Sequence, residues 1–379
     1  MTLFGKQQEF FGLDISGTSV KVVQLKPGPS KPSLVAYGGM VLPVGSMQSD
    51  SEVDLQNVSN AIRQVVKKAK ISATQCVAAL PGSGVFTSII RMPAMPKGEL
   101  ADSIRWQAKQ YVPSPLEEVI LDWHVVGEHV KKPAPGQKAA GTAGTADAAD
   151  SAGQSGGSGT AATAGDKEIE VMLIAAPIAL VRKYVKIISG AGLKAAALEI
   201  EPLSLARSVV GVRQEPVVVL DVGQAGSEIS IVENGIIRLN RNTTAGGGAL
   251  TRAISQSLGV DANRAEQFKR DFGLREDKLE GQIPKAVKPV LDTMVAEIRR
   301  SLDFYREQPH PQGDIREMVV VGGTARMPEL LPLLSGTFGV EAKIGDPWAN
   351  VNYASALKQQ LHELAPSFSV TVGLAMREM

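Results

Sequence analysis

The stretch GLDISGTSVK, residues Gly12 to Lys21, predicts how the N-terminal part of the chain folds. An apolar run ends at Asp14, and a turn of small residues containing Gly17 follows it. A strand that ends in a carboxylate and a small-residue turn presents backbone N–H groups to a phosphate and an oxygen ligand to its metal ion. We therefore expect a phosphate-binding turn between two strands here.

Two later stretches follow the same plan, each an apolar run that enters a turn of small residues. One such turn is a weak signal, because buried strands often end at glycine for steric reasons alone. Three turns in this order indicate a nucleotide-binding core built from repeated strand–turn units. The two later stretches are VVVLDVGQAGSEIS (Val217 to Ser230) and VVVGGTARMPEL (Val319 to Leu330).

Length and composition narrow the class of protein. With 379 residues the chain can form two domains or several subdomains. The 40 Lys and Arg residues nearly cancel the 39 Asp and Glu residues, and aromatic residues are only 4% of the chain. This balance argues against nucleic acid as a partner, because neither a basic field nor a base-stacking surface is available.

The compartment is predicted from three further features. The single cysteine, Cys76, excludes an intramolecular disulfide and fits a reducing environment. No apolar run reaches the roughly twenty residues that a membrane-spanning helix needs. The N-terminus lacks the pattern of a signal peptide. We therefore expect a cytoplasmic protein without a direct membrane span.

The apolar pattern predicts the order of the elements. Strands in residues 11–42, a helix from about Leu55 to Ala69 and a strand from Cys76 to Leu80 are the opening of an α/β domain. One strand is expected to end near residue 130, and a second strand, paired with it, to begin at residue 168. Between them lies a tract of Ala, Gly, Ser and Thr from 133 to 166, for which we predict disorder. A long helix is expected from Ala286 to about Arg306.

The three turns resemble the nucleotide-binding signature of the actin-like ATPase superfamily, which includes actin, DnaK-type chaperones, MreB and FtsA. The segment IRWQAKQYVPSPLEEVILDW (Ile104 to Trp123) is, in addition, similar to the PilM family of type IV pilus assembly proteins. So are AEIRRSLDFYREQ (Ala296 to Gln308) and the C-terminal VTVGLAMR. The resemblance implies an α/β fold with a duplicated actin-like (ribonuclease H-like) ATPase core and an FtsA-like relocated subdomain.

The resemblance also implies a division of the chain and two cofactors, ATP and Mg²⁺. The first lobe would comprise residues 1–88, and the relocated subdomain residues 89–190 with the insert 133–166. The second lobe would comprise residues 191–350, and residues 351–379 would return to the core. Asp14 and Asp221 would hold the metal ion through water.

The remaining site residues follow from the same resemblance. Phosphate contacts are expected from the first two turns and from three glycines that precede a helix, although close helix packing would explain those glycines equally well, and the third turn is expected to support the adenosine. The phosphate-binding set is Asp14, Ser16, Gly17, Thr18, Ser19, Lys21, Asp221, Gly223, Gln224, Ser227, Gly246, Gly247 and Gly248, and the adenosine-binding set is Glu297, Arg300, Gly322, Gly323 and Thr324.

The family resemblance implies partners as well. The ATP-bound protein would capture the short N-terminal cytoplasmic tail of PilN, an inner-membrane protein, and link it to the cytoplasmic motor. It would thereby sit at the inner membrane, beneath the PilN–PilO complex. The pilus motor ATPases, PilC and further copies of the chain in a ring are the other partners that the resemblance suggests.

Catalytic residues are not assigned, and two other functions stay open. The strand EVMLIAAP (Glu170 to Pro177) offers no side chain in position to orient an attacking water, so we expect ATP binding with at most weak hydrolysis. A small-molecule kinase of the same fold would need a catalytic base, and none identifies itself. A filament protein of the FtsA kind would need an amphipathic C-terminal anchor, which SFSVTVGLAMREM (Ser367 to Met379) does not resemble.

Overall fold

The structure is a computed structural model that describes residues 9–130, 167–308 and 313–377. Its first sheet has five strands in the order β3-β2-β1-β4-β8. Strands β1, β2 and β3 pair antiparallel with one another, and β4 and β8 continue the sheet from β1 in parallel. The strands are β1 (Phe10–Ile15), β2 (Ser19–Lys26), β3 (Ser33–Val41), β4 (Gln75–Leu80) and β8 (Lys194–Ile200).

The second sheet repeats this plan. Its order is β11-β10-β9-β12-β13, again with three antiparallel strands followed by two parallel ones. The predicted duplication of the core is therefore confirmed. The strands are β9 (Val217–Val222), β10 (Ser227–Glu233), β11 (Ile236–Thr243), β12 (Glu317–Val321) and β13 (Glu341–Ile344).

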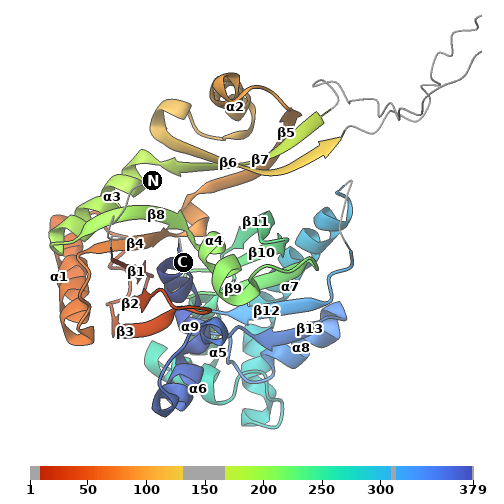
Figure 1. Cartoon of the computed structure of the whole chain (residues 1–379). Coiled ribbons are helices and arrows are strands. Elements are labelled where there is room, and N and C mark those ends of the chain that lie inside the picture. The colour runs from red at the N-terminus through yellow and green to blue at the C-terminus, as the bar shows by residue number, and fades with distance from the viewer. Residues whose placement is uncertain (1–8, 131–166, 309–312, 378–379) are drawn as a thin grey trace, which may run out of the picture.

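A third, smaller unit lies against the two lobes (Figure 1). Its antiparallel sheet has the order β5-β7-β6, and α2 (Lys97–Tyr111) covers one face. The strands are β5 (Phe86–Pro93), β6 (Val119–Val130) and β7 (Lys167–Pro177). Strands β6 and β7 are paired as predicted, whereas the tract 133–166 predicted to be disordered lies outside the described residues.

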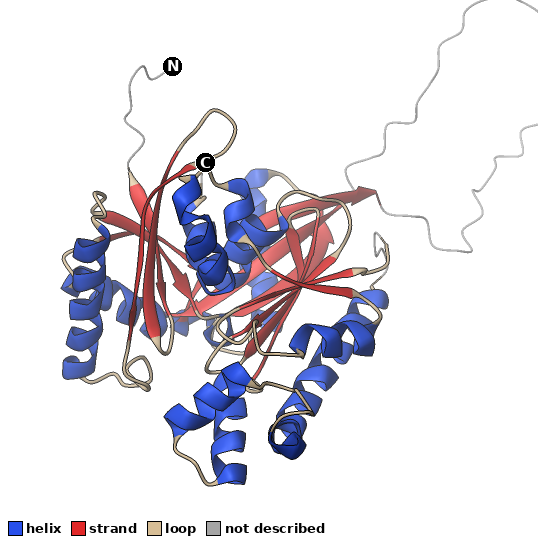
Figure 2. Cartoon of the chain, turned by 90° about the horizontal axis from the view of Figure 1, so that it is seen from below, coloured by secondary structure: helices blue, strands red, loops and turns tan. Residues whose placement is uncertain are grey.

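Helices cover the outer flanks of both sheets, and a further group lies between the sheets (Figure 2). The helices on the outer flank of the first lobe are α1 (Glu52–Ala69) and α3 (Ile178–Gly190). In the second lobe they are α5 (Gly247–Leu258), α6 (Ala262–Asp271), α7 (Gln282–Arg306) and α8 (Leu330–Phe338). The predicted long helix is α7, whose apolar stripe is buried as expected. In the part of the chain that is described, no helix is long and apolar enough to cross a membrane.

The C-terminal helix α9 (Lys358–Ala375) contacts strands of both sheets and joins the lobes. It approaches β1 so closely that a Cβ atom at Gly12 would lie 2.3 Å from the carbonyl oxygen of Thr371. The glycine at the start of the stretch from Gly12 to Lys21 therefore serves helix packing, whereas the residues after it form the turn.

One predicted boundary is wrong. The sequence places residues from 191 onward in the second lobe, but β8 pairs with β4 in the first sheet, for example Lys194 opposite Gln75. Helix α3, predicted to belong to the relocated subdomain, buries Tyr184, Ile187 and Ile188 in the core of the first lobe. The three-stranded unit is an insertion between β4 and α3, and the chain returns to the first sheet after it. The remaining boundaries stay a prediction.

Candidate functional site

The first turn is held together by its own polar side chains. Asp14 and Lys21 are opposite one another in the β1–β2 register, and Lys21 Nζ lies 2.9 Å from Asp14 Oδ2. Asp14 is only 4% exposed. The backbone N–H of Ser16 donates to the carbonyl of Ser19, and the two hydroxyls lie 2.9 Å apart. Open space surrounds the Cα of Gly17, so the turn leaves room beside its backbone.

The second turn faces inward from the other lobe. Asp221 lies on β9 next to the turn, directly opposite Glu228 of β10. Ser227 is buried, and its hydroxyl donates to the carbonyl of Ala245 at 2.6 Å. Its predicted contact with phosphate stays a prediction, and the structure gives the side chain a local partner instead.

Of the three predicted glycines, Gly246 is the N-cap of α5, and Gly247 and Gly248 are the first residues of that helix; all three contact the second turn. The backbone N–H of Gly247 donates to the carbonyl of Gly223 at 2.8 Å, and that of Gly248 donates to Gln224 at 2.9 Å. A Cβ atom at Gly246 would lie 2.6 Å from the Cα of Gly226. Of the two explanations left open by the sequence, close packing accounts for these contacts, since both donors are already used within the protein.

Only glycine fits the third turn at the position where its backbone contacts Asp221. Gly322 has a φ of +90°, and a Cβ atom there would lie 2.3 Å from Asp221 Oδ1. At its neighbour Gly323, a Cβ atom would meet no other atom within 4 Å. Thr324 lies close by, because its Oγ1 would be 2.4 Å from a Cβ atom at Gly247. The second and third turns are thus in direct contact.

Four carboxyl groups from both lobes interact at the junction of the turns. Burial, and then the negative charge of Asp14, raises the pKa of Asp221 to about 6, while Lys21 acts in the opposite direction. Burial raises the pKa of Glu228 to about 8. Burial and the charges of its three acidic neighbours, Glu228 first, raise the pKa of Glu201 well above its usual value. The first and second turns therefore face one another within electrostatic range.

This cluster fits a hydrated divalent cation. Glu228 is 6% exposed, and its Oε2 is a buried oxygen without a hydrogen-bond partner among the described residues. A cation would compensate the charge that now raises the pKa values of the cluster. Within residues 9–130, 167–308 and 313–377, no three His, Cys, Asp or Glu side chains converge as direct ligands. The arrangement suits a metal ion held through water, the role predicted for Asp14 and Asp221.

Glu201 and Glu228 were missed by the sequence analysis. Glu201 begins α4 (Glu201–Leu205) directly after β8, and its Oε2 accepts from the backbone N–H of Gly82 at 3.3 Å. The expectation of weak hydrolysis rests on the strand of residues 170–177 alone and leaves this carboxylate out. The sequence does contain a signal for Glu201: an apolar run ends at this carboxylate, and Pro202 follows it at the start of a helix.

A second missed pair lies beside the predicted adenosine turn. Lys269 of α6 is 3% exposed, and its Nζ contacts Glu266 at 2.6 Å and the carbonyl of Gly247 at 3.1 Å. Desolvation lowers the pKa of Lys269. By contrast, Glu297 pairs with Arg300 and with Arg241 of β11. The structure thus brings Lys269, rather than Glu297 or Arg300, to Gly247 and Thr324, and the adenosine role of Glu297 and Arg300 stays a prediction.

The raised pKa values predict that the apo protein loses stability as the pH rises. Carboxyls whose pKa is higher when folded than when unfolded stabilise the fold below their unfolded pKa, and this contribution is lost as the pH passes the folded values. For Asp221 and Glu228 these are about 6 and about 8. The melting temperature of the apo protein should therefore fall from about pH 4, near the unfolded pKa values, up to about pH 8, and the part above pH 6 should come from Glu228. Glu228→Gln should flatten the upper part of that dependence, and an equally steep profile would contradict the assignment.

Comparison with known proteins supplies a family. A family described as "Type IV pilus assembly protein PilM" matches residues 12–143 and 158–379. The fold is also similar to a solved PilM–PilN type IV pilus biogenesis complex, with a TM-score of 0.76 and 26% sequence identity. That match covers 97% of this chain and 98% of the other. MreB 5 of Spiroplasma citri, bound to AMPPNP, shares the fold at a TM-score of 0.51 and 13% identity, over 99% of this chain and 97% of the other.

Curated relatives support the same superfamily. The cell division protein FtsA of Streptococcus pneumoniae is 23% identical over 48% of this chain and 43% of the relative. FtsA of Neisseria meningitidis is 23% identical over 54% of this chain and 53% of the relative. The chain thus spans about half the length of the curated relatives it matches. Together with the duplicated sheets, these similarities confirm an actin-like ATPase fold.

Proposed function

The chain belongs to the family of the type IV pilus assembly protein PilM, and on this premise we propose that it is an ATP-binding adaptor of the pilus assembly machine. In this proposal it binds the N-terminal cytoplasmic tail of PilN and links that inner-membrane protein to the cytoplasmic motor. The observation that carries the proposal is the similarity, over nearly the whole of both chains, to a PilM–PilN complex. The protein would then be cytoplasmic and held at the inner membrane through PilN.

The nucleotide would lie between the first and second turns. Lys21 would neutralise phosphate charge, and Asp14 and Asp221 would orient the water around Mg²⁺, which supplies charge compensation when bound. Gly323 has open space beside it for the adenosine, and Lys269 with Glu266 would contact its ribose or base. The nucleotide-bound MreB 5 of the same fold supports this placement at the level of the fold.

ATP would act on the partner site by holding the lobes together. The residues proposed to bind ATP come from both lobes, so bound nucleotide favours the arrangement in which the first and second turns approach one another. A ligand can shift such an equilibrium only by the difference in its affinity for the two arrangements. The effect of ATP on PilN binding is therefore bounded by its own preference for the closed lobes.

The PilN tail is proposed to bind the three-stranded unit. The family-like segment of residues 104–123 comprises the C-terminal half of α2 and the start of β6. Ile104 is fully buried, whereas Trp106 and Tyr111 are 63% and 45% exposed. Two exposed aromatic side chains on one helix are more than the core of this unit requires, and aromatic residues are enriched in protein interfaces. An extended peptide would gain affinity from main-chain hydrogen bonds and a few side-chain pockets.

The adaptor role is tested by capture from membranes. Detergent-solubilised inner membranes of a piliated bacterium would be passed over the immobilised protein with Mg·ATP or with EDTA. PilN and PilO should be retained with ATP, with the motor ATPases and PilC as further candidates. A Trp106→Ala, Tyr111→Ala variant serves as the matched control. Retention of PilN that is equal on the variant, the native protein and a blank resin would contradict the proposal.

Glu201 gives a prediction about hydrolysis. The expectation of weak turnover rests on the lack of a water-orienting residue in the strand of residues 170–177, and Glu201 removes that reason. A carboxyl with a raised pKa beside the phosphate turns suits a general base. Glu201→Gln should lower phosphate release by about 100-fold, at the lower end of general-base contributions, while the ATP affinity changes little. Equal rates in both proteins, measured by phosphate release at saturating ATP, would exclude this role.

A further inference from the structure

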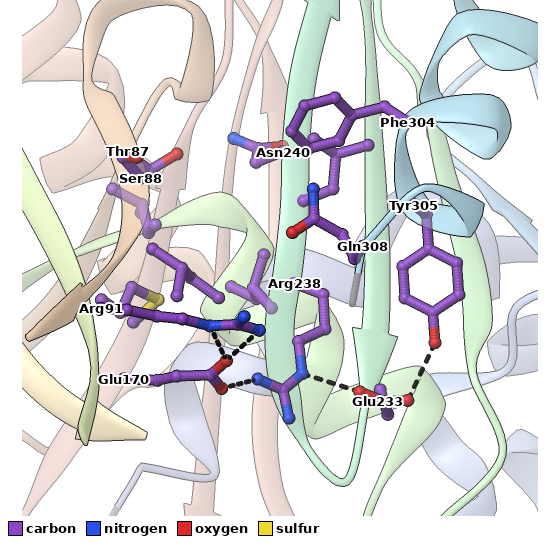
Figure 3. A pocket seen from close by; sticks show the side chains of 15 residues that line it. Thr87, Ser88, Arg91, Glu170, Glu233, Arg238, Asn240, Phe304, Tyr305 and Gln308 are labelled. Carbon is purple, nitrogen blue, oxygen red and sulfur yellow. Dashed lines mark hydrogen bonds and ion pairs between the residues drawn. The ribbon is translucent and has the colours of Figure 1, made fainter. Parts of the chain in front are cut away.

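A network of charged side chains around two buried carboxylates crosses from the three-stranded unit to the second lobe (Figure 3). Glu170 of β7 accepts hydrogen bonds from Arg91 of β5 at 3.0 and 2.9 Å and from Arg238 of β11. Arg238 also donates to Glu233 at 2.7 Å, and the hydroxyl of Tyr305 donates to Glu233 at 2.8 Å. The side chains of Glu170 and Glu233 are only 4% and 2% exposed, so both charges depend on these partners.

Only one of these contacts crosses between the two units. Arg91 and Glu170 both belong to the three-stranded sheet, and Arg238, Glu233 and Tyr305 all belong to the second lobe. If the contact between Arg238 and Glu170 opens, each half keeps an arginine beside its carboxylate. Separation therefore leaves neither buried carboxylate without a cation. This is the arrangement expected of a contact that opens and closes, because a static ion pair would strand a charge when broken.

The structure leaves space for that movement. A cavity of about 280 Å³ adjoins the network, lined on one side by Thr87 and Ser88 of β5 and on the other by Asn240 of β11 and Phe304 of α7. This cavity is open toward solvent, and Phe304 in its lining is 41% exposed, so the side chains that line it have room to rearrange.

Strand β11 connects the network to the nucleotide cluster. Asn240 stands two residues after Arg238, and both side chains line the cavity, although the pairing of β10 and β11 shifts register at Arg238. The Nδ2 group of Asn240 donates to Glu228 Oε1 at 3.0 Å, and Glu228 is opposite Asp221 in the register of the second turn. One strand thus connects the second turn to Arg238.

We propose that the contact between Arg238 and Glu170 is a latch that ties the three-stranded unit to the second lobe when nucleotide closes the lobes. The inference rests on the proposed function and adds its regulation: the unit proposed to bind the PilN tail is fixed or released according to the state of the nucleotide site. Arg238 acts as a positioning residue and touches no nucleotide. Arg238 acts by changing how strongly bound nucleotide favours the closed over the open arrangement of the lobes.

The test is amide hydrogen exchange of the full-length protein, followed by mass spectrometry, with and without a non-hydrolysable Mg·ATP analogue. In the native protein the analogue should slow exchange in β5 and β7 by at least about fivefold, the low end of typical couplings. Arg238→Gln should still bind the analogue, with an affinity, measured by titration, that falls by about the same fivefold because the coupling is reciprocal, and it should lose this slowing. Arg213→Gln is the matched control: Arg213 pairs with Glu317, which keeps Lys343 just as Glu170 keeps Arg91.

The outcomes separate the latch from the proposed function. Analogue binding without slower exchange in β5 and β7 of the native protein overturns the latch and leaves nucleotide binding intact. Slowing that persists in Arg238→Gln also overturns it. Failure of the native protein to bind the analogue removes the nucleotide part of the proposed function and the latch with it. If Arg238→Gln does not fold, Glu170→Gln, which removes the charge of the other partner in the latch, repeats the comparison.

Discussion

Asp14→Ala is expected to lower the affinity for Mg·ATP by roughly 100-fold, or about 3 kcal/mol, the low end of the cost of removing one partner from a buried charged set. Asp14 is buried, pairs with Lys21 at 2.9 Å and lies within electrostatic range of Asp221. Without it, the water around Mg²⁺ loses one of its two predicted carboxylates. Lys21 is at the same time freed to bind phosphate directly.

The measurement is a calorimetric titration of ATP in Mg²⁺ and in EDTA. In the native protein the affinity should be much higher with Mg²⁺, and in Asp14→Ala this advantage should nearly vanish. Asp292→Ala, which breaks an exposed ion pair with Lys288, controls for the loss of one negative charge. Circular dichroism checks that the variants are folded. A folded Asp14→Ala protein with the native advantage of Mg²⁺ would refute the placement of the metal ion.

Substitution of the adjacent glycines of the third turn, Gly322 and Gly323, is expected to give the second large effect on stability and ATP binding. At Gly322, φ is +90° and a Cβ atom would lie 2.3 Å from Asp221 Oδ1. Gly322→Ala should therefore cost roughly 2–5 kcal/mol through backbone strain and overpacking, displace Asp221 and abolish ATP binding. At Gly323 a Cβ atom meets nothing within 4 Å. Gly323→Ala should leave the melting temperature of the apo protein unchanged.

The same pair of variants tests the adenosine position. If adenosine fills the space beside Gly323, the added methyl group should weaken ATP binding by about tenfold, or about 1.4 kcal/mol, without any loss of apo stability. Thermal melts and ATP titrations of both variants give the two readouts. Native ATP affinity in Gly323→Ala would place the adenosine elsewhere, and native stability in Gly322→Ala would contradict the steric account of the turn.

The sequence predicts the features that depend on local pattern. The strand–Asp–turn units, the hairpin partners and the buried stripe of α7 are all confirmed, because each follows from alternation or helical periodicity over a few residues. The repeated turns also led to the duplicated core. The roles of the individual residues toward ATP remain predictions, since they concern a ligand and not the fold of the chain.

The features that the sequence did not reveal are contacts between distant segments. Strand β8 was assigned to the wrong lobe because an inserted unit separates it from its partner β4, and pairing across an insertion leaves no local pattern. Glu201 joins the carboxyl cluster only once β8 is in place. Arg238 and Glu170 are 68 positions apart and meet through the docking of two sheets. Each of these residues would be ordinary surface charge if judged from its neighbours in sequence.

The central claim is that nucleotide between the lobes controls capture of a PilN tail by the three-stranded unit. Its most direct test is titration of a fluorescent peptide with the N-terminal sequence of PilN from the same organism, with Mg·ATP and with EDTA, beside a scrambled peptide. The account predicts that only the native peptide binds and that its affinity rises by at least about fivefold with Mg·ATP. Equal, weak binding of both peptides in both conditions would contradict it.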